Sequence, residues 1–336
     1  MRLIATRLLA AVPTLMGVII VTFVLTRMLP GDAAAYFAGP AATADSIEAT
    51  RHRLGLDRPL PEQFVLYIEG LSRGDLGRSL TSGQSVLDDL RNRLPASLEL
   101  TFAALLVALG LGIPLGVGAA LKPGGRIDNL CSLLSTIGQA TPTFFLGLLL
   151  VFVFYYLLAW VPAPIGRLDV VYSPPHEITG AWSIDAALAG DWKLLGAVLR
   201  QLILPVTTLA LFGLGPLARV TRASMIEVLA SDYVRTARAA GLPSRKVLRA
   251  YALPNAVVPV LNASGMLFSF MLGASVLVEK VFGWPGIGAY AIDAVLASDF
   301  APVQGFVLAM ALLYLLLNLI IDVVDGVLDP RVRFDA

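Results

Sequence analysis

The stretch YVRTARAAGLPSRKVLRAYALPN, Tyr233 to Asn255, is rich in arginine and in residues that favour helices, yet apolar runs of membrane length lie on both sides of it. Gly241 is suited to the end of one helix, and Pro243 to the first turn of the next. The stretch therefore predicts a helix, a sharp Gly-Pro turn and a second helix that is broken at Leu253–Asn255.

The wider segment 219–255 carries seven basic and two acidic side chains. Its charge alone leaves two interpretations open. It is a basic loop that lies on anionic lipid, or it is a docking surface for a partner protein.

The composition of the whole chain points to a membrane protein. Of 336 residues, 57% are hydrophobic and 15% are charged, whereas soluble domains carry about 25% charged residues. A net charge of +1 excludes a broad nucleic-acid-binding surface. One cysteine, Cys131, precludes a disulfide within the chain, and two histidines without ligands at metal-binding spacing make a zinc site improbable. We expect neither a metal nor a cofactor in this chain.

Long runs without Asp, Glu, Lys or Arg predict the membrane spans. A bilayer core of about 30 Å takes about 20 helical residues. Six runs stand out, at 8–26, 100–121, 129–166, 201–218, 250–278 and 300–321. We interpret each as one helix, the third being one tilted span plus the start of an apolar loop. The fold class expected is an all-α polytopic membrane protein with six transmembrane helices.

The distribution of lysine and arginine predicts the orientation of these spans. With the N-terminus inside, the cytoplasmic loops and ends hold thirteen such residues, whereas the short outer loops hold Arg167 and Lys193, with Arg200 and Lys280 at their edges. Both termini are therefore expected in the cytoplasm.

These spans divide the chain into three parts. Residues 1–30 form an N-terminal segment with the first transmembrane helix, 31–95 an extracytoplasmic domain, and 96–336 a five-helix core whose cytoplasmic loop lies at about 219–255. The stretch SVLDDLRNRLPASLEL, from Ser85 to Leu100, predicts an amphipathic helix before the second span. Pro95 is expected to end that helix, and Ser97 to cap the next.

Polar residues inside the spans are candidates for a translocation pathway. Four are uncharged, and Glu279 lies at the outer end of the fifth span: the candidates are Gln139, Thr141, Thr143, Glu279 and Asn318. The alternative for the uncharged residues is ordinary helix–helix hydrogen bonding, and for Glu279 an interfacial charge. Four glycines of the second span are interpreted as packing positions: Gly110, Gly112, Gly116 and Gly118.

Gly241 is followed twelve and thirteen residues later by Leu253 and Pro254. This spacing resembles the cytoplasmic loop of ABC importer permeases, written E-A-A, three residues, Gly, nine residues, I-x-L-P. The chain departs from that pattern at its glutamate, where Arg235 stands, and at its isoleucine, where Tyr251 stands. The stretch DYVRTARAAGL is similar to the form in the dipeptide/oligopeptide branch, in which the glutamate is commonly absent.

Three further stretches resemble the same branch. They are MLPGDAA (28–34), the run from LGLDRPLPEQF to LGIPLGVGAA (54–120), and VEKVFGWPGIG (278–288). Together with the loop motif they cover nearly the whole chain, which we identify as a member of this branch.

The resemblance implies a type I ABC importer permease fold in the bacterial cytoplasmic (inner) membrane. It also implies that the loop is a coupling helix seated in a groove of a cytoplasmic ATPase, with these coupling residues: Arg235, Thr236, Ala237, Arg238, Ala239, Ala240, Gly241, Leu253 and Pro254. The implied partners are a second related permease, two ATPase subunits and an extracytoplasmic substrate-binding protein. The 31–95 domain is expected to dock the binding protein or to brace the sister permease.

The chain is expected to have no ATPase site of its own. None of its four lysines follows a glycine, so the Gly-Lys of a phosphate-binding loop is absent. ATP and Mg²⁺ would therefore be bound by the partner ATPases.

The resemblance further implies import of di- or oligopeptides. The alternative is the same architecture importing nickel complexes, glutathione or another small solute. A secondary transporter, the rival from another class, would place carboxylates or broken helices at the midplane, and the predicted spans lack such carboxylates.

Overall fold

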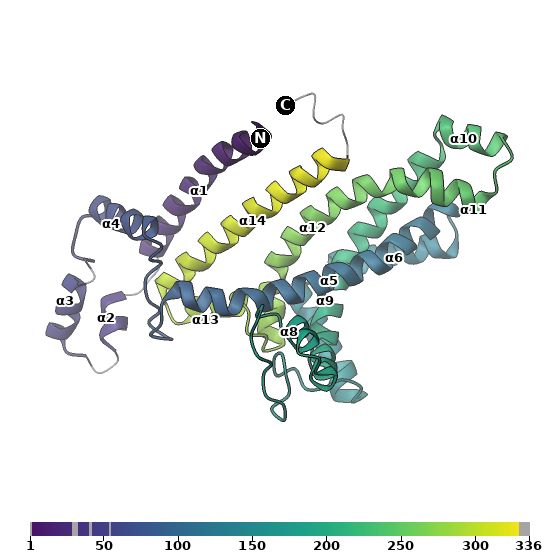
Figure 1. Ribbon diagram of the computed structural model, residues 1–336. Helices are drawn as coiled ribbons and strands as arrows, with labels where there is room; N and C mark the ends of the chain where they lie inside the picture. Colours follow the sequence, from purple (N-terminus) through teal and green to yellow (C-terminus); the bar gives the residue numbers. More distant parts are fainter. Residues whose placement is uncertain (1, 29–32, 40–41, 54, 329–336) are drawn as a thin grey trace. The chain divides into compact units, whose positions relative to one another are not determined.

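The computed structural model describes residues 2–28, 33–39, 42–53 and 55–328, and in these ranges it is helical and contains no strand (Figure 1). The all-α prediction is confirmed. The helices have these bounds: α1 Arg2–Met28, α2 Ala33–Ala38, α3 Ala44–Arg53, α4 Leu60–Ser72, α5 Val86–Leu121, α6 Arg126–Ala140, α7 Thr143–Leu150, α8 Trp182–Leu188, α9 Trp192–Leu229, α10 Asp232–Ala239, α11 Ser244–Lys246, α12 Leu253–Val281, α13 Ile287–Leu296 and α14 Phe300–Leu328. Two π-helical segments, η1 (Val151–Leu157) and η2 (Val247–Ala252), continue α7 and α11.

Four stretches of helix in the described part of the chain are long and apolar enough to cross a bilayer: Val86–Leu121, Trp192–Leu229, Ser244–Val281 and Phe300–Ile321. A bent pair of helices, 126–140 with 143–157, raises the number to five if it counts as one span. In addition, α1 holds the shorter apolar stretch Ala11–Leu25. The chain is thus a helical protein with several membrane spans.

The third predicted span departs from the expectation. The stretch TPTFFLGLLLVFVFYYLLAW (141–160) is one helix over 143–157, as its apolar run predicts, but a second helix, 126–140, precedes it and the two meet at 107°. The break falls at Thr141, whose backbone is extended (φ −96°, ψ 125°), directly before Pro142. The proline ring disfavours a helical conformation at the residue before it and lacks the N–H that would continue the helix. The apolar pattern continues across this break, so it does not reveal the bend.

Pro95 does not end a helix as predicted, because α5 runs unbroken from Val86 to Leu121. Tertiary contacts surround this point of the helix. The indole Nε1 of Trp284 donates to the carbonyl of Ala96 at 2.9 Å, and the Ser97 hydroxyl donates to Glu279 at 2.6 Å rather than capping a helix. Long-range bonds therefore hold the helix in place directly after Pro95.

The chain forms two compact units, the first made of residues 1–95 and 285–316 and the second of 96–284 and 317–336. In the first unit, Val86 and Leu90 of α5 form a buried cluster with Ile287 and Tyr290 of α13. The carboxylate of Asp299 accepts hydrogen bonds from the Ser79 hydroxyl (2.8 Å) and the Leu80 amide (2.6 Å). Residues far apart in sequence thus share one core with the segment predicted as an outer domain.

In the second unit, α9 packs against α6, α7, α8 and α12. Glycines let these helices approach closely. A Cβ on Gly138 of α6 would lie 2.6 Å from the Leu211 carbonyl, and one on Gly215 of α9 would lie 2.6 Å from Ser135 Cα. The Ser135 hydroxyl donates to the Gly215 carbonyl at 2.7 Å, which ties α6 to α9 at the same place.

The four glycines predicted to pack in α5 behave differently from one another. A Cβ on Gly116 would meet the Ala218 carbonyl at 2.5 Å, and one on Gly112 would meet Leu217 Cβ at 3.2 Å. Gly118 faces Ile127 at 3.2 Å, whereas Gly110 has nothing within 4 Å. The packing interpretation is confirmed for three of the four and wrong for Gly110.

Candidate functional site

The segment that follows α9 folds as the predicted helix, turn and helix. After the turn at Ala230–Ser231, α10 ends at Ala239, and Gly241 takes the left-handed conformation (φ +77°). The Gly241 amide donates to the Arg238 carbonyl (3.0 Å) and the Leu242 amide to the Ala237 carbonyl (3.3 Å). This pair of bonds is a Schellman motif, in which glycine is favoured because it lacks a Cβ.

The second predicted break, at Leu253–Asn255, is not present. The stretch Ser244–Val281 is one continuous membrane-length helix, in which η2 leads directly into α12. Pro254 stands in the first turn of α12. The wider turn of η2 changes the hydrogen-bonding register just before the proline, which avoids the clash that a regular helix would have there. The turn after α10 is therefore joined rigidly to a spanning helix.

The inner face of α10 rests on this continuous helix. Val234 and Ala237 of α10 are buried against Val247 of η2. Leu242 and Tyr251 pack against the same cluster, so both sides of the Gly-Pro turn are held together. A second buried cluster joins this region to the long helices, with Ala120 of α5, Met225 of α9, Ala252 at the end of η2 and Ala256 near the start of α12.

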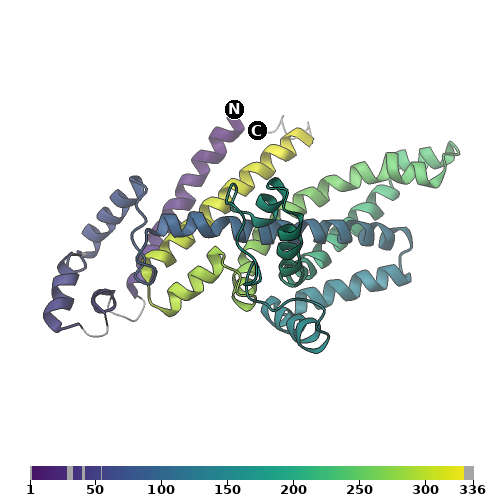
Figure 2. The same ribbon diagram turned by 60° about the horizontal axis from the view of Figure 1, so that its bottom comes forward.

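The outer face of α10 is open. Among the predicted coupling residues, the exposed ones are Arg235, Thr236, Arg238, Ala239, Ala240, Gly241 and Pro254. Ala237 is buried in the cluster below, and Leu253 is half-buried. The segment projects at one tip of the long helices α9 and α12, as Figures 1 and 2 show. Two exposed arginines on this face suit a partner that carries acidic side chains.

An ion pair braces the spans near this tip. The guanidinium of Arg222 on α9 binds both carboxylate oxygens of Asp128 on α6, at 2.6 and 2.9 Å. The amide of Gly124 donates to the same carboxylate at 2.8 Å. A two-pronged Arg–carboxylate pair holds both orientation and distance, so the start of α6 is tied to α9 next to the open segment.

The predicted pathway residues lie on several elements. Gln139 is exposed near the end of α6, Thr141 and Thr143 are half-buried on either side of the bend, and Asn318 is half-buried on α14. Glu279 differs from these because its side chain is fully buried. It accepts hydrogen bonds from the hydroxyls of Ser97 on α5 (2.6 Å) and of Ser275 in its own helix (3.3 Å), and the first of these fastens the C-terminal end of α12 to α5.

A second buried charge pair was missed by the sequence analysis, in which Arg167 counted only as a charge of an outer loop. Arg167 lies 2.5 Å from Glu99 of α5, and each side chain is 4% exposed. The guanidinium also sits 4.2 Å from the ring centroid of Trp182 and donates to the Gly180 carbonyl. Burial lowers the pKa of Arg167, while Glu99 acts in the opposite direction. The pair fastens the loop before α8 to α5.

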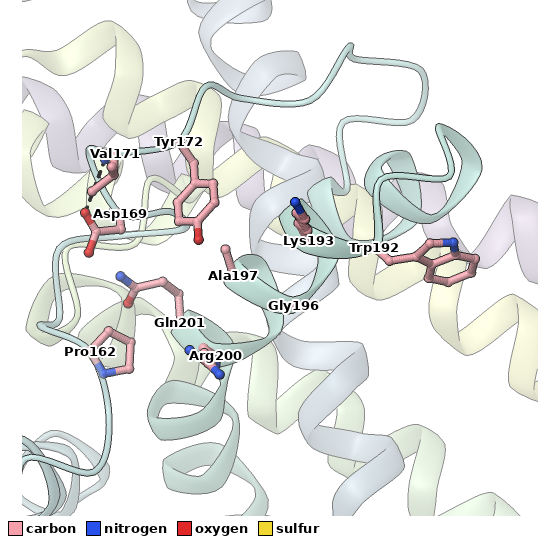
Figure 3. Close-up of a pocket in the computed structure, with 10 residues that line it drawn as sticks. All are labelled: Pro162, Asp169, Val171, Tyr172, Trp192, Lys193, Gly196, Ala197, Arg200 and Gln201. Carbon is pink, nitrogen blue, oxygen red and sulfur yellow. Dashed lines mark hydrogen bonds between the residues drawn. The ribbon is translucent and has the colours of Figure 1, made fainter.

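A pocket opens where this loop meets the beginning of α9 (Figure 3). Its volume is about 570 Å³, and its lining comes from the loop and the first turns of α9. The lining residues are Pro162, Asp169, Val171, Tyr172, Trp192, Lys193, Gly196, Ala197, Arg200 and Gln201. The pocket thus combines two cations, one carboxylate and several apolar side chains.

Comparison with known proteins yields a consistent set of matches. Residues 112–334 match the family model described as "Binding-protein-dependent transport system inner membrane component", and residues 1–101 match the model of the N-terminal part of such components. A probable D,D-dipeptide transport system permease protein (DdpB) of Escherichia coli K12 is 42% identical over 94% of this chain and 93% of its own length.

Two other relatives match over nearly the full length of both chains. A di/tripeptide transport system permease protein (DppB) of Pseudomonas aeruginosa is 40% identical, with 98% of each chain covered. A dipeptide transport system permease protein (DppB) of Alkalihalophilus pseudofirmus is 35% identical, again with 98% of each chain covered.

Proposed function

Because this chain belongs to the family of inner membrane components of binding-protein-dependent transport systems, we propose that it is the permease subunit through which an ABC importer moves di- or oligopeptides into the cell. As a member of that family it resides in the inner membrane and crosses it several times. The near full-length relatives are named for dipeptide and tripeptide transport. Their names favour peptides over nickel complexes, glutathione or other small solutes.

The observation that carries the proposal is the construction of the coupling segment. The exposed, glycine-terminated helix α10 is seated on η2, and η2 runs without a break into the membrane-length helix α12. A displacement of α10 from the cytoplasmic side would therefore move α12 as well, because no flexible loop separates η2 from α12.

We place six spans in the membrane. Four are the membrane-length helices, and the fifth is the bent pair of helices on either side of Pro142. The sixth is α1, which holds the apolar stretch Ala11–Leu25. The match of residues 1–101 to the N-terminal family model supports counting α1 as a span. The excess of lysine and arginine around the coupling segment supports a cytoplasmic position for it and for both termini. The loop between 158 and 181 is then on the outer side.

The partners proposed are a second, related permease, two ATPase subunits and an outer substrate-binding protein. ATP and Mg²⁺ would be bound by the ATPase subunits, because this sequence has no Gly-Lys of a phosphate-binding loop. The exposed residues Arg235, Thr236 and Arg238 to Gly241 would contact an ATPase. Ala237 and Leu253 would act from below, by holding α10 and η2 in place.

Uptake by the reconstituted transporter tests this function. Proteoliposomes containing this chain, its sister permease, the ATPases and the binding protein would receive labelled dipeptides with ATP, without ATP, or with a proton gradient alone. We expect uptake only with ATP. Uptake driven by the proton gradient alone would overturn the proposal. ATP-dependent uptake of another solute, with no uptake of any peptide, would overturn the assignment of peptides as the substrate.

A pair of glycine variants tests the coupling segment. Gly241 (φ +77°) and Gly74 (φ +77°) both have left-handed backbones with nothing within 4 Å of an added Cβ. Gly241→Arg would place a bulky cation at the docking face, so peptide uptake should fall at least about tenfold while ATP hydrolysis continues. Gly74→Arg carries the same backbone strain outside that face and should retain uptake. Equal uptake by the two variants would contradict the assignment.

A further inference from the structure

We infer that the pocket between the 162–172 loop and the first turns of α9 is a binding site for a short linear peptide with free amino and carboxyl ends. The inference rests on the proposed peptide function and on the outer position of the loop. It adds a subsite in this chain at which a peptide is held after leaving the binding protein.

The first support is a buried hydrogen-bond donor without an acceptor. Gln201 lines the pocket and is only 6% exposed. Its Nε2 has no hydrogen-bond partner among the described residues. Buried polar atoms are almost always hydrogen-bonded, and one that is not calls for an explanation. An acceptor supplied by a ligand in the pocket provides it.

The second support is the charge of the lining. Arg200 directly precedes Gln201 in α9 and Lys193 lies about two turns earlier in the same helix, and all three side chains are hydrogen-bond donors. A carboxylate is the ligand group that satisfies an amide donor and cations together, and such charge-assisted bonds are the stronger kind. The carboxyl end of a peptide meets this requirement.

A carboxylate of the protein lies at the other end of the pocket. Figure 3 shows Asp169, Pro162 and the Gln201 amide on one side of the pocket and Lys193 on the other, with Tyr172 between them, whereas the ring of Trp192 points away. One oxygen of Asp169 accepts from the Val171 amide at 3.3 Å, and carboxylate oxygens have capacity for further donors. Separated opposite charges suit a zwitterion, whose ammonium group would lie near Asp169.

The size and the apolar lining agree with this ligand. A volume of about 570 Å³ is in the usual range of small-molecule sites, about 300–1,000 Å³. Val171, Trp192 and Ala197 contribute apolar groups to the lining, and Val171 and Trp192 are largely exposed. Recognition would therefore depend on the two charged ends of the peptide and would tolerate different side chains.

Binding to the whole transporter in nanodiscs, without the binding protein, tests the inference. The probes are radiolabelled Ala-Ala, its C-terminal amide and its N-acetyl derivative. We expect Ala-Ala to bind at least about tenfold more tightly than either blocked form, because each loses one charged end. Equal affinity of the amide and the free acid would overturn the proposal.

Variants locate the binding. Gln201→Leu removes the buried donor, and Arg200→Gln removes a cation, so each should weaken binding of Ala-Ala about tenfold. Arg91→Gln removes an exposed arginine of α5 that does not line the pocket, and it should leave binding unchanged. If all three variants bind alike, the pocket is not the site.

Filling the pocket gives a test that does not depend on removing a buried group. Gly196 lines the pocket, and an added Cβ there meets nothing within 4 Å. Gly196→Leu should fold and abolish binding of Ala-Ala. Gly110→Leu is the matched control, since Gly110 is also a helical glycine with open space but lies outside the pocket. Retained binding in Gly196→Leu would overturn the site.

The two proposals fail in different ways. The wild type and the Gly196→Leu variant could show the same ATP-driven peptide uptake. That result would overturn the subsite and leave the proposed function standing. Binding of Ala-Ala that requires the binding protein would mean that a surface of that protein occupies the pocket, which also overturns the subsite. Binding that Gly196→Leu abolishes, with no peptide uptake by the wild type, would support the subsite and count against the proposed function.

Discussion

At the scale of single residues, several buried charges of the second unit have partners within that unit. Glu279, a candidate for the translocation pathway, is fully buried and accepts a hydrogen bond from Ser97, so this contact holds α12 against α5. Glu99 and Arg167 form an ion pair in which each side chain is 4% exposed. A buried charge without its partner is costly, so neither member of the pair is expected to tolerate loss of the other.

Arg167→Leu alone should therefore destabilise the purified permease by about 3–5 kcal/mol, because Glu99 would remain buried without its partner. The double variant Glu99→Leu/Arg167→Leu should recover much of this loss. Thermal unfolding in detergent measures both. A double variant as unstable as the sum of the two single variants would show that the two charges do not act as a pair.

At the scale of helices, small residues determine how closely α5 and α9 pack. In Gly116→Ala the new methyl would lie 2.5 Å from the Ala218 carbonyl, and overpacking of this kind costs about 1–3 kcal/mol. Gly110→Ala in the same helix has open space and should gain about 0.5–1 kcal/mol from helix propensity. Unfolding midpoints of the two variants are expected to move in opposite directions, and equal shifts would refute the close contact.

The loop before α8 depends on one carboxylate. Asp185 is fully buried and accepts hydrogen bonds from the Thr179 amide (2.8 Å), the Thr179 hydroxyl (2.7 Å) and the Gly180 amide (3.0 Å). Burial acts to raise the pKa of Asp185, but the hydrogen bonds from Thr179, Ile178 and Gly180 outweigh it, so the pKa is lowered. The ionised form is thus the one that stabilises the loop.

A pH dependence follows from this shift. Because the pKa of Asp185 is lower in the folded loop, its contribution is fully present above the ordinary carboxyl pKa of about 4 and is lost as pH falls through the folded value. The backbone amides of Thr179 and Gly180 should become less protected from hydrogen exchange in acid. Asp185→Asn should show weaker protection at neutral pH and little further loss in acid. Protection in the wild type that is unchanged at low pH would contradict this role.

At the scale of the whole molecule, the proposed orientation places α10 and the 162–178 loop on opposite sides of the membrane. Native Cys131 is buried, and Cys131→Ser removes it as a background. A cysteine introduced as Ala240→Cys should react with a membrane-impermeant maleimide from the cytoplasmic side only. The Ser173→Cys variant, at an exposed position of the loop, should react from the outer side only. Labelling of both from one side would overturn the orientation.

The helix and glycine turn of the proposed coupling segment (233–255) could be predicted because their signals are local, whereas the break predicted at Leu253–Asn255 is absent. A basic, helix-forming stretch with Gly241 before a proline specifies its own turn, and the Schellman motif at Gly241 confirms the prediction. The burial of Ala237 was not predictable in the same way, since it depends on Val247 across the turn. The pocket was missed altogether: Lys193 and Arg200 entered the sequence analysis only as charges at the edge of an outer loop.

The sequence by itself determined the helical class, most of the membrane-length segments, the glycine turn after α10 and the membership of the family, because hydropathy, turn chemistry and motif spacing are properties of neighbouring residues. Only the tertiary structure decided the 107° bend at Pro142, the passage of α5 through Pro95, the partners of Glu99 and Glu279 and the burial of the Gln201 amide without a partner among the described residues. The bond from Ser97 to Glu279 joins positions 182 apart in the chain. Such contacts set which polar groups are satisfied once the helices have packed, and no local pattern encodes that.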